Sequence, residues 1–195
     1  MSNHLKIGDK KMKKMMMTAM MMVMTISASA MSYSQARNEA LFLSDKMAYE
    51  LNLTSEQYDA VYEINLDYMM SVNGKSDVSG VWWNRRNADL RFVLTSWQYR
   101  QYQDLKYFYR PLSWKSGRLV FNVYNHYGNR SLFYRARPTV FVSYRGGNNH
   151  KSAHFYADRR GKAPLHATGS PVHAVKKGKG HVYRVAATSK GRSHF

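Results

Sequence analysis

Apolar residues recur at helical spacing soon after the start of the chain. Between residues 37 and 51 they follow one another at intervals of three and four. The positions are Ala40, Leu43, Met47 and Leu51. Because an α-helix turns once every 3.6 residues, this spacing places the four side chains on one face. We therefore predict an amphipathic helix here, with that face turned toward a core.

A second helix is predicted to begin after Thr54 and to end at Asn73 and Gly74, since glycine is favoured just past a helix C-terminus. One side of its helical wheel carries Tyr58, Val61, Ile64, Tyr68 and Val72. The opposite side carries Glu56, Asp59, Glu63 and Asp67. A polar stripe opposite an apolar one usually faces water. These carboxylates are therefore predicted to be solvated.

Two further helices are predicted after a loop that contains Gly80. A short one covers about residues 85–93. A longer one covers residues 95–109 and stops before Pro111, because proline disfavours helical backbone at the residue before it. Its inward-facing positions are Gln98, Tyr102, Leu105 and Tyr109. The front of the chain is thus predicted to be helical.

The pattern Leu-Thr-x-x-Gln occurs twice in this helical part. The copies are Leu53, Thr54 and Gln57, then Leu94, Thr95 and Gln98. Each threonine directly precedes a predicted helix, where its hydroxyl can accept a hydrogen bond from the backbone N–H three residues on. The glutamine at that position can reach back to the threonine N–H, and the leucine can pack on the first turn. Both copies are predicted to be structural hinges rather than catalytic groups.

These two motifs give the chain a resemblance to the LTXXQ-motif family of periplasmic proteins, typified by spheroplast protein Y and the Cpx-pathway inhibitor. The resemblance covers roughly residues 37–112. It implies a four-helix hairpin that dimerises into a cradle and holds unfolding proteins without ATP; some members instead damp an envelope-stress sensor kinase, and others sense metal. The short third helix, the acidic stripe and the long basic extension depart from the family pattern.

Residues 1–30 have the order of a secretory signal peptide. Five lysines come first, an apolar run from Met15 to Ile26 follows, and Ala28 and Ala30 end it. This run is shorter than the roughly 20 residues that a membrane-spanning helix needs. We therefore expect cleavage near Ala30 and a periplasmic or secreted protein. Because the chain has no cysteine, it must fold without disulfides.

Charge divides the remaining chain in two. Residues 31–112 hold nine basic and ten acidic side chains, whereas residues 113–195 hold sixteen basic side chains and one acidic one, Asp158. In the basic part, residues 119–127 and 139–144 are rich in β-branched and aromatic residues and predict β-hairpins. A turn is predicted at residues 146–149. Residues 159–195 have little to bury, so disorder is expected there.

The basic part offers candidates for contact with an anionic surface. They are Arg135, Arg137, Arg145, Arg159, Arg160, Lys162, Lys176, Lys177 and Lys179. Lipopolysaccharide, a membrane surface or an acidic protein would suit such a patch. Nucleic acid is not expected, because export argues against a genomic target. A purely solubilising tail is the alternative interpretation.

Catalytic and metal chemistry find little support in the sequence. No nucleophile elbow, phosphate-binding glycine loop or HExxH motif is present. His150 and His154 are four residues apart, but the glycines and asparagines before them disfavour a helix that would align them. We expect no enzyme, no metal site and no cofactor.

The sequence therefore predicts a mainly α protein in four parts: a signal peptide (1–30), an LTXXQ-like helical domain with two hinges (31–112), an aromatic and basic extension with β-hairpins (113–158), and a disordered basic tail (159–195). Its expected function is ATP-independent, chaperone-like binding or modulation of an envelope-stress response. The expected partners are partly folded envelope proteins, a sensor kinase and a second copy of the chain. The alternative is a structural or adhesive protein whose basic region binds anionic envelope surfaces.

Overall fold

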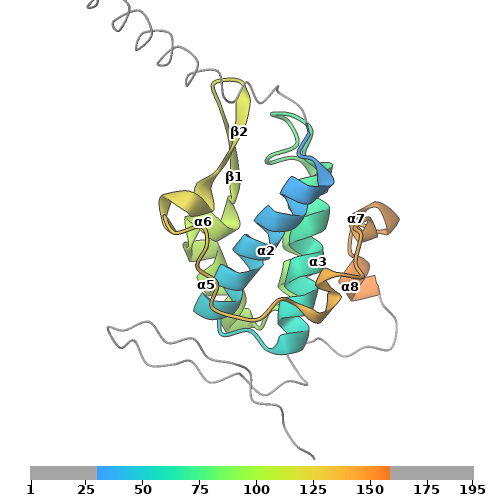
Figure 1. Cartoon of the computed structure of the whole chain (residues 1–195). Coiled ribbons are helices and arrows are strands. Elements are labelled where there is room, and N and C mark those ends of the chain that lie inside the picture. The colour runs from blue at the N-terminus through green and yellow to red at the C-terminus, as the bar shows by residue number, and fades with distance from the viewer. Residues whose placement is uncertain (1–29, 159–195) are drawn as a thin grey trace, which may run out of the picture.

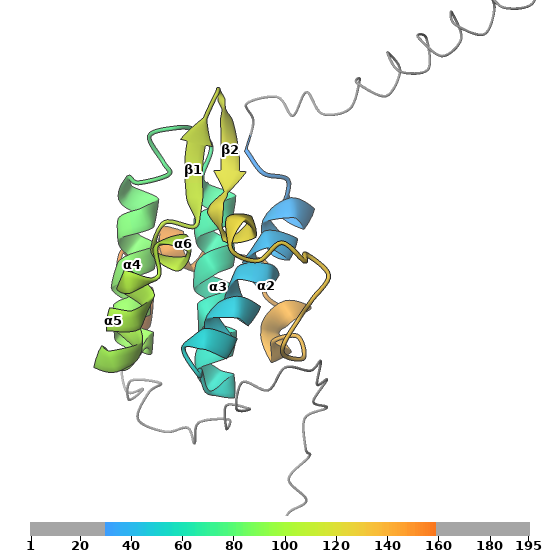
Figure 2. The same ribbon diagram turned by 90° about the vertical axis from the view of Figure 1, so that its left-hand side faces the viewer.

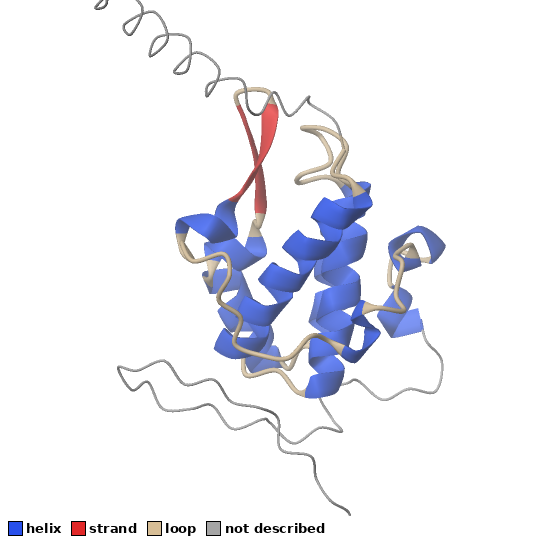
Figure 3. Cartoon of the chain, viewed as in Figure 1, coloured by secondary structure: helices blue, strands red, loops and turns tan. Residues whose placement is uncertain are grey.

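The computed structural model describes residues 30–158, and this part of the chain is mainly helical, as predicted (Figure 3). The longer helices are α2 (Tyr33–Glu50), α3 (Ser55–Ser71), α4 (Val81–Val93) and α5 (Ser96–Asp104), and the single-turn helix α6 (Lys106–Tyr109) follows them. The predicted signal peptide and basic tail lie outside the described residues. No helix within residues 30–158 is long and apolar enough to cross a membrane.

Helices α2 and α3 lie side by side, α4 packs against α3, and α5 follows α4 (Figures 1 and 2). The inward faces predicted for the first two helices are confirmed. The four α2 positions, Ala40, Leu43, Met47 and Leu51, are fully buried. The five α3 positions, from Tyr58 to Val72, are at most 4 % exposed. Apolar periodicity therefore located this part of the core.

The third and fourth predicted helices differ from the structure. Helix α4 begins at Val81, directly after Gly80, and so is longer than expected. The predicted fourth helix is two helices, because Leu105 leaves the helical region with φ −80° and ψ 86°. After this break Phe108, rather than Leu105, enters the core.

The strands match the prediction only at residues 119–121. Strand β1 (Leu112–Lys115) pairs antiparallel with β2 (Arg118–Phe121) through a turn at Ser116 and Gly117, both with positive φ. The predicted strand over residues 119–127 ends at residue 121. There Asn122 donates a hydrogen bond from its side chain to the Arg110 carbonyl and begins the 3₁₀ helix η1 (Asn122–Asn125).

The predicted strand over residues 139–144 is absent; η2 (Thr139–Phe141) occupies its start. The predicted turn at residues 146–149 is only partly right, because Asn148 begins helix α7 (Asn148–Lys151). A last short helix, α8, covers Phe155–Asp158.

Residues 122–158 form a strap over the helices, mostly irregular in backbone. The strap starts beside α6, crosses α2 and α3, and places α7 against α3 and α8 against α4 (Figure 1). It contributes Val123, Phe141 and Tyr156 to the core, each at most 5 % exposed. The strap is therefore part of the folded unit.

Candidate functional site

Both Leu-Thr-x-x-Gln motifs form the predicted capping boxes. In the first, the Gln57 N–H donates to Thr54 Oγ1 at 3.2 Å and the Thr54 N–H donates to Gln57 Oε1 at 3.1 Å. In the second, Gln98 and Thr95 make the same two bonds at 3.2 and 2.9 Å. Each box satisfies two backbone donors that a helix start would otherwise leave unpaired.

The two motifs also bind each other, which sequence reasoning did not foresee. Gln57 Nε2 donates to Gln98 Oε1 at 2.8 Å, and Gln98 Nε2 donates to Gln57 Oε1 at 3.1 Å. Gln57 Nε2 also donates to the Val93 carbonyl at the end of α4. Gln98 Nε2 donates to the Leu51 carbonyl at the end of α2. Each glutamine thus joins the start of its own helix to the end of a helix from the other pair.

The acidic stripe of α3 faces water only in part: Glu56 is exposed, as predicted, whereas, contrary to prediction, the strap covers Asp59 and Glu63 partly and Asp67 fully. Asp67 is only 3 % exposed and accepts hydrogen bonds from Tyr144 Oη at 2.7 Å and from the N–H groups of Gly147 and Asn149 at 2.6 and 3.1 Å. Asp59 accepts from the backbone N–H and the hydroxyl of Thr139. The stripe is therefore the surface on which the strap is bound.

Glu63 belongs to the same surface, since it accepts hydrogen bonds from the Tyr156 hydroxyl and the Asn148 side chain. Helix α2 adds two further carboxylates. Glu39 accepts from Tyr124 at 2.5 Å, and Glu50 accepts from the hydroxyls of Tyr107 and Tyr127. Tyrosine hydroxyls paired with carboxylates thus recur along the strap.

Asp45 and Lys46 form a fully buried ion pair at 2.8 Å. Asp45 also accepts the N–H groups of Tyr134 and Arg135, and Lys46 donates to the Leu132 carbonyl. Four aromatic rings surround the ammonium, with centroids at 4.4 to 5.5 Å: Phe42, Tyr127, Phe133 and Tyr134. Ion pairing, hydrogen bonds and ring faces together compensate for the lost hydration of this lysine.

A second buried cation, Arg86, is 2 % exposed and is satisfied by neutral groups. It donates to Asn65 Oδ1 at 2.8 Å, to Tyr102 Oη at 2.7 Å and to the Phe108 carbonyl at 3.1 Å. Arg86 therefore joins α3, α4, α5 and α6. The sequence did not predict this burial, because a charged side chain in a surface helix is ordinarily expected to face water.

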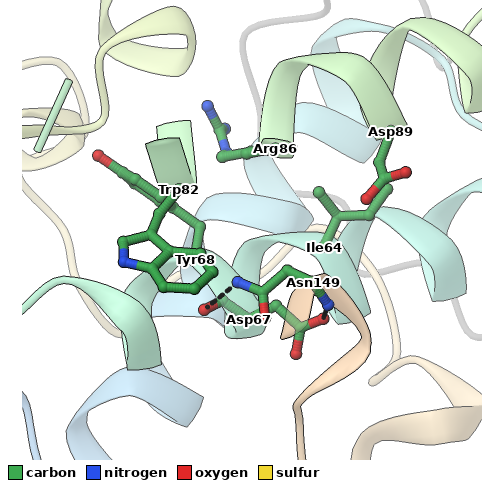
Figure 4. A pocket seen from close by; sticks show the side chains of 7 residues that line it. All are labelled: Ile64, Asp67, Tyr68, Trp82, Arg86, Asp89 and Asn149. Atoms are coloured by element: carbon green, nitrogen blue, oxygen red, sulfur yellow. Dashed lines mark hydrogen bonds between the residues drawn. The ribbon is translucent and has the colours of Figure 1, made fainter. Parts of the chain in front are cut away.

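The strap closes over the cluster beside Arg86 (Figure 4). Asp67 and Asp89 lie there with Asn149, whose side chain donates to the Asp67 carbonyl at 3.1 Å, and the packing leaves no room for a water molecule. Burial raises the pKa of Asp89 to about 7, although the Tyr156 N–H donates to it at 3.1 Å. Burial also raises the pKa of Asp67.

The residues predicted to contact anions are divided by the structure. Arg135 is partly buried over the Tyr58 ring and donates to the Leu53 carbonyl at 2.8 Å, so it supports the first motif. Arg137 and Arg145 are exposed on the strap. The other six, Arg159, Arg160, Lys162, Lys176, Lys177 and Lys179, lie outside the described residues.

His150 and His154 are placed by α7 and the residues after it. The His150 ring packs on Trp82 at 4.5 Å, and its Nε2 lies 3.3 Å from Ser71 Oγ. Within residues 30–158 no three His, Asp or Glu side chains are grouped so as to hold a metal ion.

Comparison with known proteins gives no relative. No family model, no curated protein and no solved structure matches this chain.

Proposed function

We propose that this protein is an exported, ATP-independent binding protein of the LTXXQ type, which holds partly folded envelope proteins or modulates an envelope-stress response. The docked motifs support the LTXXQ-type core, a four-helix hairpin with two hinges at Thr54 and Thr95. Partly folded envelope proteins, a sensor kinase and a second copy of this chain are its proposed partners, and the periplasm its proposed location.

The observation that carries the proposal is how the strap is bound. Four aspartates accept main-chain N–H groups from it: Asp45 from residues 134 and 135, Asp59 from 139, Asp67 from 147 and 149, and Asp89 from 156. Main-chain N–H groups are present in almost any sequence. A surface that binds them is suited to many extended segments, as a chaperone requires.

The strap occupies this surface in the closed chain, so a client segment must compete with it. Competition is expected to be easiest where a contact is exposed, as at Asp59 and Thr139. Loosening the strap there should therefore speed client binding, while the apolar core stays intact.

Suppression of aggregation by the full chain tests this proposal. Thr139→Ala removes the hydroxyl bonded to Asp59 and should increase suppression of an aggregating client. Ser143→Ala is the matched control, because the Ser143 hydroxyl donates only to Val140 in its own turn at 3.4 Å. The proposal is wrong if the unmodified chain and Thr139→Ala both fail to hold any client.

Export is tested separately. Fractionated cells should contain the mature protein outside the cytoplasm, with Met31 as its first residue. Recovery of chains that begin at Met1 only from the cytoplasm would contradict the proposed location.

Adhesion to anionic envelope surfaces is the second candidate. Arg137 and Arg145 support it, because both guanidinium groups are exposed on the strap beside aromatic rings, Arg137 at 4.9 Å from the Phe141 centroid and Arg145 at 5.8 Å from that of Tyr33. Replacing both arginines with glutamine should weaken lipopolysaccharide binding, and so should replacing Lys176, Lys177 and Lys179 with glutamine. Added salt should weaken the binding of the unmodified chain steeply, because it screens these charges. Unchanged binding by both variants would exclude these residues as the adhesive part.

A further inference from the structure

An open groove of about 420 Å³ lies between α6 and η1, on a part of the surface that the strap's aspartate contacts do not reach. Its lining residues are Lys106, Tyr107, Arg110, Asn122, Asn125 and His126. Two of these side chains are cationic, a third is a histidine, and none is a carboxylate. The volume is in the range of small-ligand sites.

Arg110 is held in place by stacking. Its guanidinium lies 3.6 Å from the centroid of the Trp83 ring, and the Trp83 indole N–H donates to the Tyr109 carbonyl at 2.9 Å. The Asn122 side chain donates to the Arg110 carbonyl at 2.8 Å, which fixes the backbone as well. Within residues 30–158 the guanidinium N–H groups of Arg110 make no hydrogen bond. Stacking uses the face of the group and leaves its N–H edges available to a planar or tetrahedral anion.

Two rings form the adjacent wall of the groove. Tyr107 and His126 stack with centroids 4.2 Å apart and an angle of 9° between their planes. The nearby carboxylate is Glu50, 3.9 Å from His126 Nε2. Glu50 accepts hydrogen bonds from Tyr107 at 3.0 Å and from Tyr127, and it is not one of the residues that line the groove. The open side of the groove therefore combines an apolar ring surface with cationic groups.

We propose that this groove binds a phosphorylated ligand. The phosphate accepts hydrogen bonds from Arg110 and from exposed Lys106, and the ring or sugar that carries the phosphate packs against His126 and Tyr107. The forked N–H groups of an arginine can bind two phosphate oxygens at once, which the compact ammonium of a lysine matches less well. The phosphate belongs either to a free organic phosphate or to a lipid headgroup, since both present the same group. This inference is independent of the proposed client binding, which uses the aspartates and the part of the strap from residue 134 onward.

Calorimetric titration of the full chain with phenyl phosphate at low salt tests the site. Phenyl phosphate should bind more tightly than inorganic phosphate because of its ring. Arg110→Gln should weaken its binding by about tenfold, and Lys106→Gln should weaken it by a smaller factor. Arg100→Gln is the matched control: Arg100 is exposed on α5, outside the groove lining, and its loss changes the net charge equally. The basic tail contributes the same background to every variant.

The proposal is overturned if Arg110→Gln and Arg100→Gln bind phenyl phosphate equally, since binding then reflects net charge alone. Should circular dichroism show that Arg110→Gln has lost its fold, Lys106→Gln decides in its place, because that side chain is exposed. Phosphatidylglycerol vesicles distinguish the sources. If the chain binds the vesicles, and if phenyl phosphate displaces them and Arg110→Gln weakens the binding, the groove is a headgroup site. If the chain binds phenyl phosphate but not the vesicles, the ligand is a free organic phosphate.

Discussion

The helices of residues 33–109 and the strap of residues 122–158 are held by different kinds of contact. The helices meet through apolar faces, where residues such as Leu43 are fully buried, and through the neutral Gln57–Gln98 pair. The strap is held largely by carboxylates that accept its N–H groups and tyrosine hydroxyls. Apolar burial stabilises at any pH, whereas buried carboxylates carry a desolvation cost that depends on pH. The helices are therefore expected to withstand changes of pH and sequence that loosen the strap.

Removing Arg86 should break the helical part itself. Arg86→Ala leaves Asn65 Oδ1, Tyr102 Oη and the Phe108 carbonyl without their donor, and a buried polar group without a partner is costly. We expect a loss of about 4 kcal/mol in the free energy of unfolding, measured by urea titration. Arg91→Ala, at an exposed position of the same helix, should change it by less than about 0.5 kcal/mol.

Removing Asp67 should instead release the strap. Asp67→Ala takes the acceptor from Tyr144, Gly147 and Asn149, at an expected cost of about 3 kcal/mol. Hydrogen exchange should accelerate at the Gly147 and Asn149 amides and not in α2. Asp67→Asn keeps one side-chain oxygen and should lose less. Equal acceleration in α2 and in the strap would mean that the two parts unfold together.

The pH dependence of the strap contact has a definite sign. The folded pKa of Asp89, about 7, lies above its ordinary value of 3.8. A raised pKa means that the group's stabilising contribution is complete below pH 3.8 and is lost as pH rises through 7. The unmodified chain should therefore lose up to about 4 kcal/mol relative to Asp89→Asn between pH 4 and pH 8. A constant difference between the two proteins would show that Asp89 ionises normally.

The two motifs should be energetically coupled. Gln57→Ala and Gln98→Ala are each expected to cost about 1.5 kcal/mol, since each loses a cap and a cross-link. The double variant should cost less than the sum of the two, because the second substitution no longer removes the bond between them. Strict additivity in a double-mutant cycle would contradict the reciprocal pair.

The threonine caps should give the smallest effect. Thr54→Ala or Thr95→Ala should cost about 1 kcal/mol, whereas serine at either position, which keeps the hydroxyl, should be nearly neutral. Thermal unfolding checks both pairs. If alanine and serine variants unfold at the same temperature, the hydroxyls do not stabilise these helices.

Local rules explain which parts of the structure could be predicted. The Thr54 and Thr95 caps and the buried faces of α2 and α3 follow from residues three or four apart. The break at Leu105 could not be predicted in this way. It accompanies a contact distant in sequence, since the Phe108 carbonyl after the break accepts a hydrogen bond from Arg86, 22 residues away.

The strap was missed for the same reason. Its aromatic and β-branched residues predict strands. Instead, the Thr139 N–H donates to Asp59 and the Asn122 side chain donates to the Arg110 carbonyl, and a 3₁₀ helix begins at each of these two residues. Asp67 looked solvated because nothing near it in sequence pairs with it.

The distance along the chain between the aspartates and their partners also sets the order of folding. Asp45 is 89 and 90 residues from the two amides it accepts, and Glu63 is 93 residues from Tyr156. Contacts so distant in sequence form late, because closing long loops costs entropy before the contacts form. A nascent chain therefore exposes the carboxylates of α2 and α3 until its last third has emerged. During that interval the same surface is open to other extended chains, including neighbouring copies of itself.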